Sequence, residues 1–171
     1  MGLDNYPNEY PCKTQGTAIL EDGKIDCRAT QENGGCPYVT ELDKVKTALY
    51  EEKILFGTPV YGMFGTDCWY RGKYGNYLLE ALGYSNDEKI SFYGDSEDGS
   101  KKSPASCLEL ATVIDEAIGD IEQDNAGRNE ANTTRILNGD LGSQDITAEL
   151  RYASWYLKWA AKHANGLSCW Y

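Results

Sequence analysis

Aromatic side chains near the C-terminus are the first residues whose spacing could serve chemistry. Tyr152, Tyr156, Trp159 and His163 are separated by four, three and four positions, which places them on one side of a helix. Trp155 adjoins this stripe. Flat rings with polar tips can stack on a planar ligand at low entropic cost. The same rings could instead widen the hydrophobic core, and the pattern leaves both interpretations open.

A second candidate is the stretch 57–77, which is rich in glycine and aromatic residues. Glycines allow sharp turns and a close approach of backbone to ligand. Arg71 and Lys73 could meet a phosphate together with amides at the start of a following helix. The stretch lacks both the Walker motif and the dinucleotide fingerprint, and tight turns packed by aromatics remain the alternative. The predicted ligand-binding set is Trp69, Tyr70, Arg71, Lys73, Tyr74, Tyr152, Tyr156, Trp159 and His163.

Catalytic groups are not evident. The only histidine, His163, is near Cys169 in sequence, but a Cys–His pair needs hydrogen-bonding reach that spacing does not establish. Carboxylate pairs are so numerous in an acidic chain that choosing a glycosidase-like pair would be arbitrary. We therefore predict no catalytic residues and expect binding rather than catalysis, with a small hydrolase as an alternative.

Six cysteines lie at positions 12, 27, 36, 68, 107 and 169. No Cys-x-x-Cys pair is present, although such pairs are typical of zinc sites. Cys12, Cys27 and Cys36 could close around zinc with a fourth donor, but mostly buried thiols are the expected state. We predict no metal and no cofactor. The first residues lack the pattern of a signal peptide, so a cytoplasmic protein with reduced thiols is expected.

The formal charge of −11 is distributed unevenly. Residues 87–124 contain eleven acidic residues and three lysines, whereas residues 61–84 and 146–171 are neutral to basic. Those two stretches hold 13 of the 20 aromatic residues. The net charge opposes direct binding to nucleic acid. The acidic stretch could instead mimic nucleic acid, which gives an alternative function: an acidic inhibitor that binds a host enzyme.

The helices and strands expected to position these residues indicate an α+β fold. A chain of 171 residues suits one domain, and no apolar run is long enough for a membrane span. We expect a small antiparallel sheet or hairpins packed with about four helices, because helices and strands do not alternate regularly. Expected strands are 17–20, 24–27, 58–64 and 90–93, and the expected irregular segments are 1–16, 31–37 and 124–143.

Four helices are predicted from apolar spacing and end signals. The first two cover 41–52 and 72–82. The third begins at Ser103 and Pro104, a capping residue followed by proline at the first helical position. The fourth, long and rich in aromatics, begins near Ser143 or Asp145 and ends at Asn165-Gly166.

The opening Met1-Gly2-Leu3-Asp4, the stretch 67–77 and the closing residues 166–171 resemble uncharacterised small proteins of bacteriophage and prokaryotic genomes. Small non-enzymatic phage proteins often counter host immunity, and one class sequesters nucleotide-derived signals. The resemblance therefore implies a protein in the cytoplasm of a prokaryotic host that binds a small, planar, anionic ligand. Assembly as a homo-oligomer is compatible with this interpretation.

Overall fold

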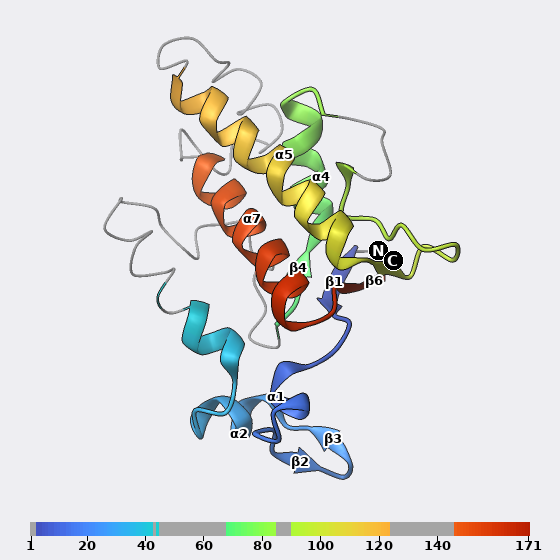
Figure 1. Ribbon diagram of the computed structural model, residues 1–171, viewed down its shortest axis with the longest axis vertical. Helices are drawn as coiled ribbons and strands as arrows, with labels where there is room; N and C mark the ends of the chain where they lie inside the picture. Colours follow the sequence, from blue (N-terminus) through green and yellow to red (C-terminus); the bar gives the residue numbers. More distant parts are fainter. Residues whose placement is uncertain (1–2, 43, 45–67, 85–89, 124–145) are drawn as a thin grey trace.

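The computed structural model describes residues 3–42, 44, 68–84, 90–123 and 146–171. It shows the expected α+β class, with a four-stranded antiparallel sheet, a separate two-stranded hairpin and several helices (Figure 1). Among the described residues, no helix combines the length and apolar character that crossing a membrane requires. The predictions for 58–64, for 124–143 and for most of 41–52 lie outside the described residues.

The larger sheet joins the two ends of the chain. Its strand order is β4 (Tyr70–Arg71), β1 (Asp4–Pro7), β6 (Leu167–Trp170) and β5 (Lys101–Lys102), and every neighbouring pair is antiparallel. The prediction that residues 1–16 are irregular is therefore wrong for β1 and for the short helix α1 (Pro11–Thr14). These strands are short, and β1 is stabilised by partners at the opposite end of the chain, which local sequence patterns do not reveal.

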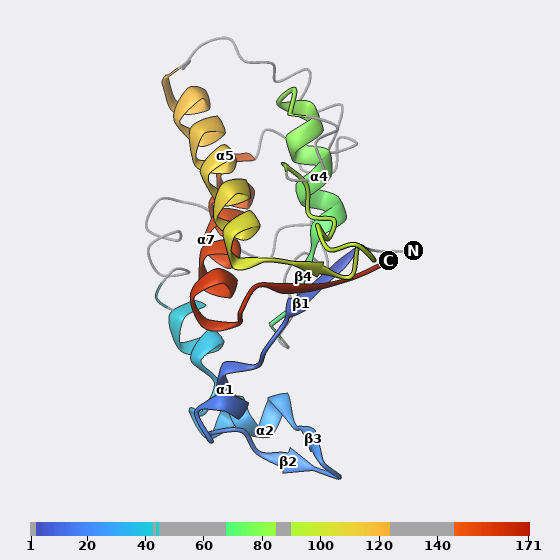
Figure 2. The same cartoon turned by 45° about the vertical axis from the view of Figure 1, so that its right-hand side comes forward.

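Three helices lie on one side of this sheet: α4 (Gly72–Ala81), α5 (Pro104–Gln123) and α7 (Ile146–His163) (Figures 1 and 2). In both views α5 and α7 run antiparallel and side by side. All three predictions are confirmed. At the start of α5 the Ser106 amide donates to Ser103 Oγ at 3.2 Å, as expected of a capping serine. Buried residues on α5 include Cys107, Leu110, Ala111, Ile114, Ala117 and Ile118.

Helix α7 buries more than one of its faces. The aliphatic positions Leu150, Ala153, Leu157, Ala160 and Ala164 are buried. Tyr152, Tyr156 and Trp159 on the adjacent face are buried as well. The helix ends where predicted, because Asn165 and Gly166 adopt left-handed conformations with φ of 53° and 84°.

The N-terminal elements lie at one end of the molecule (Figures 1 and 2). They comprise α1, the hairpin β2 (Leu20–Glu21) and β3 (Lys24–Ile25), α2 (Cys27–Glu32), and helical residues 37–42. The hairpin is confirmed with shorter strands, and its turn residues Asp22 and Gly23 have φ of 51° and 78°. The predicted strand end at Cys27 and loop start at Gln31 are wrong, because Asp26 Oδ1 accepts the Ala29 amide at 2.9 Å and starts a helix.

The strand predicted at 90–93 is absent from the structure, which has turns and bends there. The Phe92 amide donates to Asn76 Oδ1 at 2.8 Å instead of to a neighbouring strand. The Phe92 ring is buried, with its centroid 4.9 Å from that of Tyr70. A side-chain acceptor on α4 therefore replaces the strand partner that the sequence pattern implied.

Lys102 is buried on the side of the sheet that faces the helices, with 1% of its surface exposed. Its Nζ has no hydrogen-bond partner within the part of the chain that the structure describes. Burial lowers the pKa of this amine from its ordinary value, although the charge of Asp95 acts in the opposite direction. Within the described residues, this amine is therefore held away from water without a hydrogen-bond partner, and the charge of Asp95 is the main compensation for its ammonium form.

We expect Lys102→Met to raise the free energy of unfolding at pH 7, because it removes a buried amine that has no hydrogen-bond partner among the described residues. The pKa of Lys102 is lower in the folded chain than in the unfolded chain, so the unfolded parent binds more protons at pH values between the two. The free energy of unfolding of the parent therefore rises as the pH increases from the folded-state pKa towards 10.5. The difference in free energy of unfolding between the variant and the parent should therefore decrease over that pH interval. Urea titrations of both chains at pH 7 and at higher values measure this, and a variant less stable than the parent at pH 7 contradicts it.

Candidate ligand-binding surface

The four-stranded sheet has one side that faces away from the helices. Residues paired directly across antiparallel strands share a side of the sheet. Asn5, Tyr70 and Cys169 are paired with one another through β1 and are buried, so they define the inner side. The alternate positions make up the opposite side, which we call the outer sheet face: Asp4, Tyr6, Arg71, Lys101, Ser168 and Trp170.

Arg71 is held at one edge of the outer sheet face. Its guanidinium carbon lies 5.0 Å from the ring centroid of Trp69, the residue two positions earlier. Its Nε donates to Asp4 Oδ1 at 3.2 Å across the β4–β1 pair. Because Asp4 engages Nε, the two terminal nitrogens of the guanidinium fork can still meet an anion. The half-buried side chain is thus oriented by a ring and a carboxylate before any ligand arrives.

Trp170 supplies the most exposed tryptophan ring of this surface. Its side chain is 65% exposed, although it lies on a strand with three more protected residues. Asp4 pairs with Arg71 on one side and with Trp170 on the other. Arg71 and Trp170 therefore lie two strand spacings, about 10 Å, apart. In the next row, Ser168 pairs with the exposed Lys101. The outer sheet face therefore presents one indole ring and two cations around a single carboxylate, and the Trp69 ring lies against one of these cations, Arg71.

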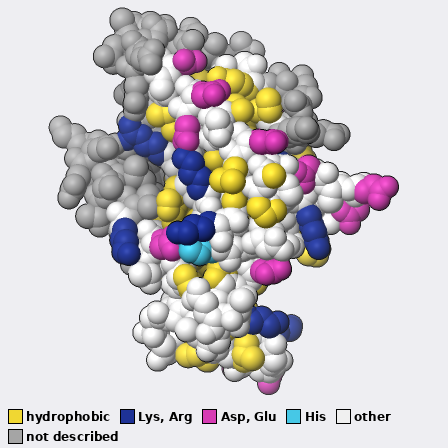
Figure 3. All heavy atoms as spheres, viewed as in Figure 1, with side chains coloured by type: hydrophobic (Ala, Val, Ile, Leu, Met, Phe, Trp, Pro, Cys, Tyr) yellow, Lys and Arg dark blue, Asp and Glu magenta, His cyan; other side chains and the backbone are white. Residues whose placement is uncertain are grey.

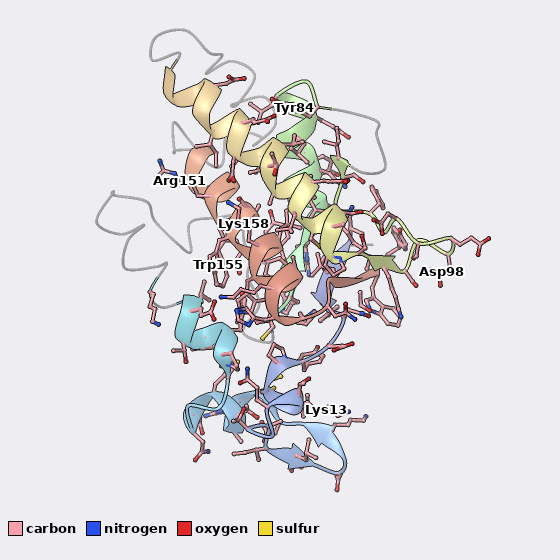
Figure 4. The ribbon with its side chains drawn as sticks, viewed as in Figure 1. Lys13, Tyr84, Asp98, Arg151, Trp155 and Lys158 are labelled. Carbon is pink, nitrogen blue, oxygen red and sulfur yellow. The ribbon has the colours of Figure 1, made fainter. Side chains whose placement is uncertain are left out.

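A second exposed aromatic group borders this face. The rings of Tyr93 and Tyr171 stack with centroids 5.4 Å apart, and Tyr171 Oη donates to the Gly99 carbonyl at 2.9 Å. The loop between these contacts carries Asp98 at its tip (Figure 4). Hydrogen bonds from Ser100 and Ser96 lower the pKa of Asp98 to about 2. This border stays negatively charged at neutral pH.

Four of the predicted ligand-binding rings lie inside the molecule. Tyr70, Tyr152 and Tyr156 are 0% exposed and Trp159 is 2% exposed. Tyr38 from the 37–42 helix covers part of this group, with its ring centroid 5.1 Å from that of Trp159. These rings have no open face for a ligand in this structure, and their predicted stacking role stays a prediction.

The Tyr156 hydroxyl shows how this interior is fixed. It donates towards the carbonyls of Asn5 and Cys68 at 2.9 and 2.8 Å. Burial raises the pKa of Tyr156 and of Tyr152 well above the ordinary value. The hydroxyl therefore stays protonated and ties α7 to the sheet.

The remaining predicted residues are scattered. His163 is half-buried at the end of α7, where its Nε2 lies 3.2 Å from Glu41 Oε1. Lys73 is half-buried in α4, and the side chain of Tyr74 is outside the described part. Cys169 Sγ contacts Asn5 Oδ1 at 3.6 Å, so the two residues considered for a Cys–His pair have different neighbours.

The helical side of the molecule separates its charges. Acidic side chains gather over α5 and basic ones over α7 (Figure 3). Glu109, Glu116 and Asp120 on α5 are exposed. Between the helices, Lys158 Nζ donates to Asp115 Oδ2 at 2.6 Å. Figure 4 shows Arg151, Trp155 and Lys158 along α7.

Of the predicted site residues, the structure brings Trp69 and Arg71 together on the outer sheet face. Sequence reasoning missed Trp170, Lys101 and Tyr6, which share that face. The alternation of Leu167, Ser168, Cys169 and Trp170 was the available signal. Comparisons with protein-family models, with curated proteins and with solved structures find no match.

Proposed function

We propose that this chain is a non-enzymatic binding protein that holds a small, planar, anionic ligand on the outer sheet face. The contact between Trp69 and Arg71, on the same face as the exposed Trp170, supports the proposal most strongly. A cation held against an aromatic ring suits a ligand in which an anionic group is attached to a planar ring. An indole that remains 65% exposed contributes little to the core and offers a face for stacking.

A nucleotide-derived signal in a prokaryotic host fits this arrangement. Arg71 would meet a phosphate, and Trp170, about 10 Å away by strand spacing, would stack on a base. Lys101 on β5 adds a second cation on the same face. Because the whole chain is acidic, an anion must be attracted by these local cations and by stacking, not by the overall field. Sequestration of the signal would follow from binding alone.

Calorimetric titration with a panel of cyclic dinucleotides and ADP-ribose derivatives tests the proposal. We expect at least one member to bind the parent chain. Arg71→Ala and Trp170→Ala should each weaken that binding tenfold or more, since stacking and charged hydrogen bonds are each worth about 1–3 kcal/mol. Thermal melts should show only small losses for Trp170→Ala, because its ring is largely exposed.

Arg28→Ala is the matched control. It removes the same charge from an exposed i,i+4 pair with Glu32 in the N-terminal elements. It should bind as the parent does. The proposal fails if no member of the panel binds the parent, or if the two outer-face variants bind with unchanged affinity.

The exposed carboxylates of α5 favour a second candidate function, an acidic inhibitor that occupies the nucleic-acid site of a host enzyme. Glu109, Glu116 and Asp120 are exposed residues of α5, as is Leu108, which is 49% exposed. Neutralising the three carboxylates should leave small-molecule binding at the outer sheet face intact. If the triple variant loses the chain's activity in the host while titrations remain normal, the inhibitor is the correct function.

A further inference from the structure

The outer sheet face repeats one order of side chains in two rows. Each row crosses three strands and consists of a cation, a small polar residue and an aromatic ring. Read from β4 to β6, the first row is Arg71, Asp4 and Trp170. Read from β5 to β1, the second row is Lys101, Ser168 and Tyr6. The two rows run in opposite directions across the sheet, so the face has two similar halves.

The pairing of the two central strands produces this symmetry. Two antiparallel strands are related by a local twofold axis perpendicular to the sheet. Here the axis passes through the pair formed by Asn5 and Cys169. Because the outer strands are antiparallel to their neighbours as well, the axis exchanges β1 with β6 and β4 with β5. It therefore relates Arg71 to Lys101 and Trp170 to Tyr6.

Burial on each of the four strands agrees with this register. On every strand the outer-face positions are more exposed than the positions between them, which are buried. Trp170 is 65% exposed and Lys101 is exposed, while Tyr6 and Arg71 are half-buried. Both rings and both cations therefore reach the molecular surface on the same side of the sheet.

The spacing of the two rings suits two separate bases. Tyr6 and Trp170 are diagonal neighbours on adjacent strands, a relationship that places residues about 7–8 Å apart. Two bases at this separation lie side by side, each on its own ring, as successive bases do on the aromatic residues of nucleic-acid-binding proteins. A ligand with one base would cover only one of the two rings.

The two cations lie outside the rings, at opposite edges of the sheet. The strands that carry Arg71 and Lys101 are three strand spacings apart, about 14 Å. Asp4 Oδ1, 3.2 Å from Arg71 Nε, and the Trp69 ring, 5.0 Å from the guanidinium carbon, hold Arg71 at its own edge. A phosphate bound by Arg71 therefore leaves Lys101 for a second anionic group.

We propose that the ligand of the outer sheet face is a cyclic dinucleotide, in which two nucleotides are joined through two phosphodiesters; this inference rests on the proposed function. Each base stacks on one ring, Trp170 or Tyr6, and each phosphodiester meets one cation, Arg71 or Lys101. The two negative charges of the ligand equal the two cations in number. The twofold symmetry of such a ligand matches the local symmetry of the face.

Calorimetric titration of the full chain tests the number of bases and phosphodiesters that the face accepts. The probes are cyclic di-AMP and cyclic di-GMP, the linear dinucleotides ApA and GpG, and the mononucleotides AMP and GMP. We expect one cyclic dinucleotide per chain, bound at least tenfold more tightly than the linear dinucleotide or the mononucleotide of the same base. The linear compound lacks one phosphodiester and the mononucleotide lacks one base, and each such contact typically changes affinity by tenfold or more.

Substitutions in the second row distinguish two halves from one. Tyr6→Ala and Lys101→Ala should each weaken binding of the cyclic dinucleotide tenfold or more. Mononucleotide binding should change little, because the first row is intact. Tyr6→Phe keeps the ring and should bind as the parent does. Lys24→Ala is the matched control, since Lys24 is an exposed lysine on a two-residue strand of the other sheet.

Two results would overturn this inference. One is equal affinity for the cyclic dinucleotide and the mononucleotide of the same base. The other is unchanged binding of the cyclic dinucleotide by both Tyr6→Ala and Lys101→Ala. If an ADP-ribose derivative binds instead, with losses for Arg71→Ala and Trp170→Ala alone, the proposed function holds and the cyclic dinucleotide is rejected. If no nucleotide binds the parent chain, both fail.

Discussion

Trp159→Ala is expected to lower the free energy of unfolding by about 3–5 kcal/mol, the usual cost of deleting a buried large aromatic side chain. Trp159 is 2% exposed, and its ring centroid lies 5.1 Å from that of Tyr38 and 6.3 Å from that of Tyr156. Its removal opens a cavity between α7 and the 37–42 helix, where the surrounding rings cannot fully collapse. Denaturant titration measures the loss.

Trp159→Phe separates packing from any role of the indole nitrogen. Trp159 Nε1 is buried without a hydrogen-bond partner among the described residues, so phenylalanine removes an unsatisfied donor while keeping a ring. The phenylalanine variant should therefore be clearly more stable than the alanine variant. A loss below about 1 kcal/mol for Trp159→Ala would contradict the placement of this residue in the core.

Gly166→Ala is expected to cost more than about 2 kcal/mol, because it combines backbone strain with a collision. Gly166 has φ of +84°, in the left-handed region that disfavours side chains. A Cβ added there would lie 2.2 Å from the Lys102 carbonyl oxygen and 3.1 Å from the carbonyl carbon of Ser103. Both atoms belong to the backbone where β5 ends and leads into α5, so relief requires moving β5 or the α7–β6 turn.

Gly34→Ala is the control for the strain alone. Gly34 has φ of +70°, but nothing lies within 4 Å of an added Cβ. Its free energy of unfolding should fall by only about 1–2 kcal/mol, the cost of placing a side chain in the left-handed conformation. Equal losses for the two variants, measured by denaturant titration, would show that β5 does not approach Gly166 as closely as the structure has it.

The three long helices could be predicted because their determinants are local. Ser103 and Pro104 mark the start of α5, and Asn165-Gly166 marks the end of α7. The strands of the larger sheet could not be predicted, since β4 and β5 have two residues each and no period. Their pairing depends on β1 and β6 meeting from opposite ends of the chain, and no pattern within a short window encodes such contacts.

The same distinction applies to the candidate site. The aromatic stripe of α7 was recognised, but a stripe does not reveal whether another element covers it. Tyr38 and Tyr70 cover it here, and both arrive from distant segments. Arg71 and Trp69 were identified from composition alone. Trp170 was missed as a binding residue because the alternation in residues 167–170 does not show which side of the strand is covered, and this depends on the register between β1 and β6.

The chain contains four tryptophans, and their indole N–H resonances test the central claim most directly. In ¹H–¹⁵N spectra recorded during titration with the best-binding nucleotide of the panel, the resonances of Trp69 and Trp170 should shift with ligand concentration. The resonance of the buried Trp159 should stay in place. Shifts confined to Trp159, or no shift at any indole, would contradict binding at the outer sheet face.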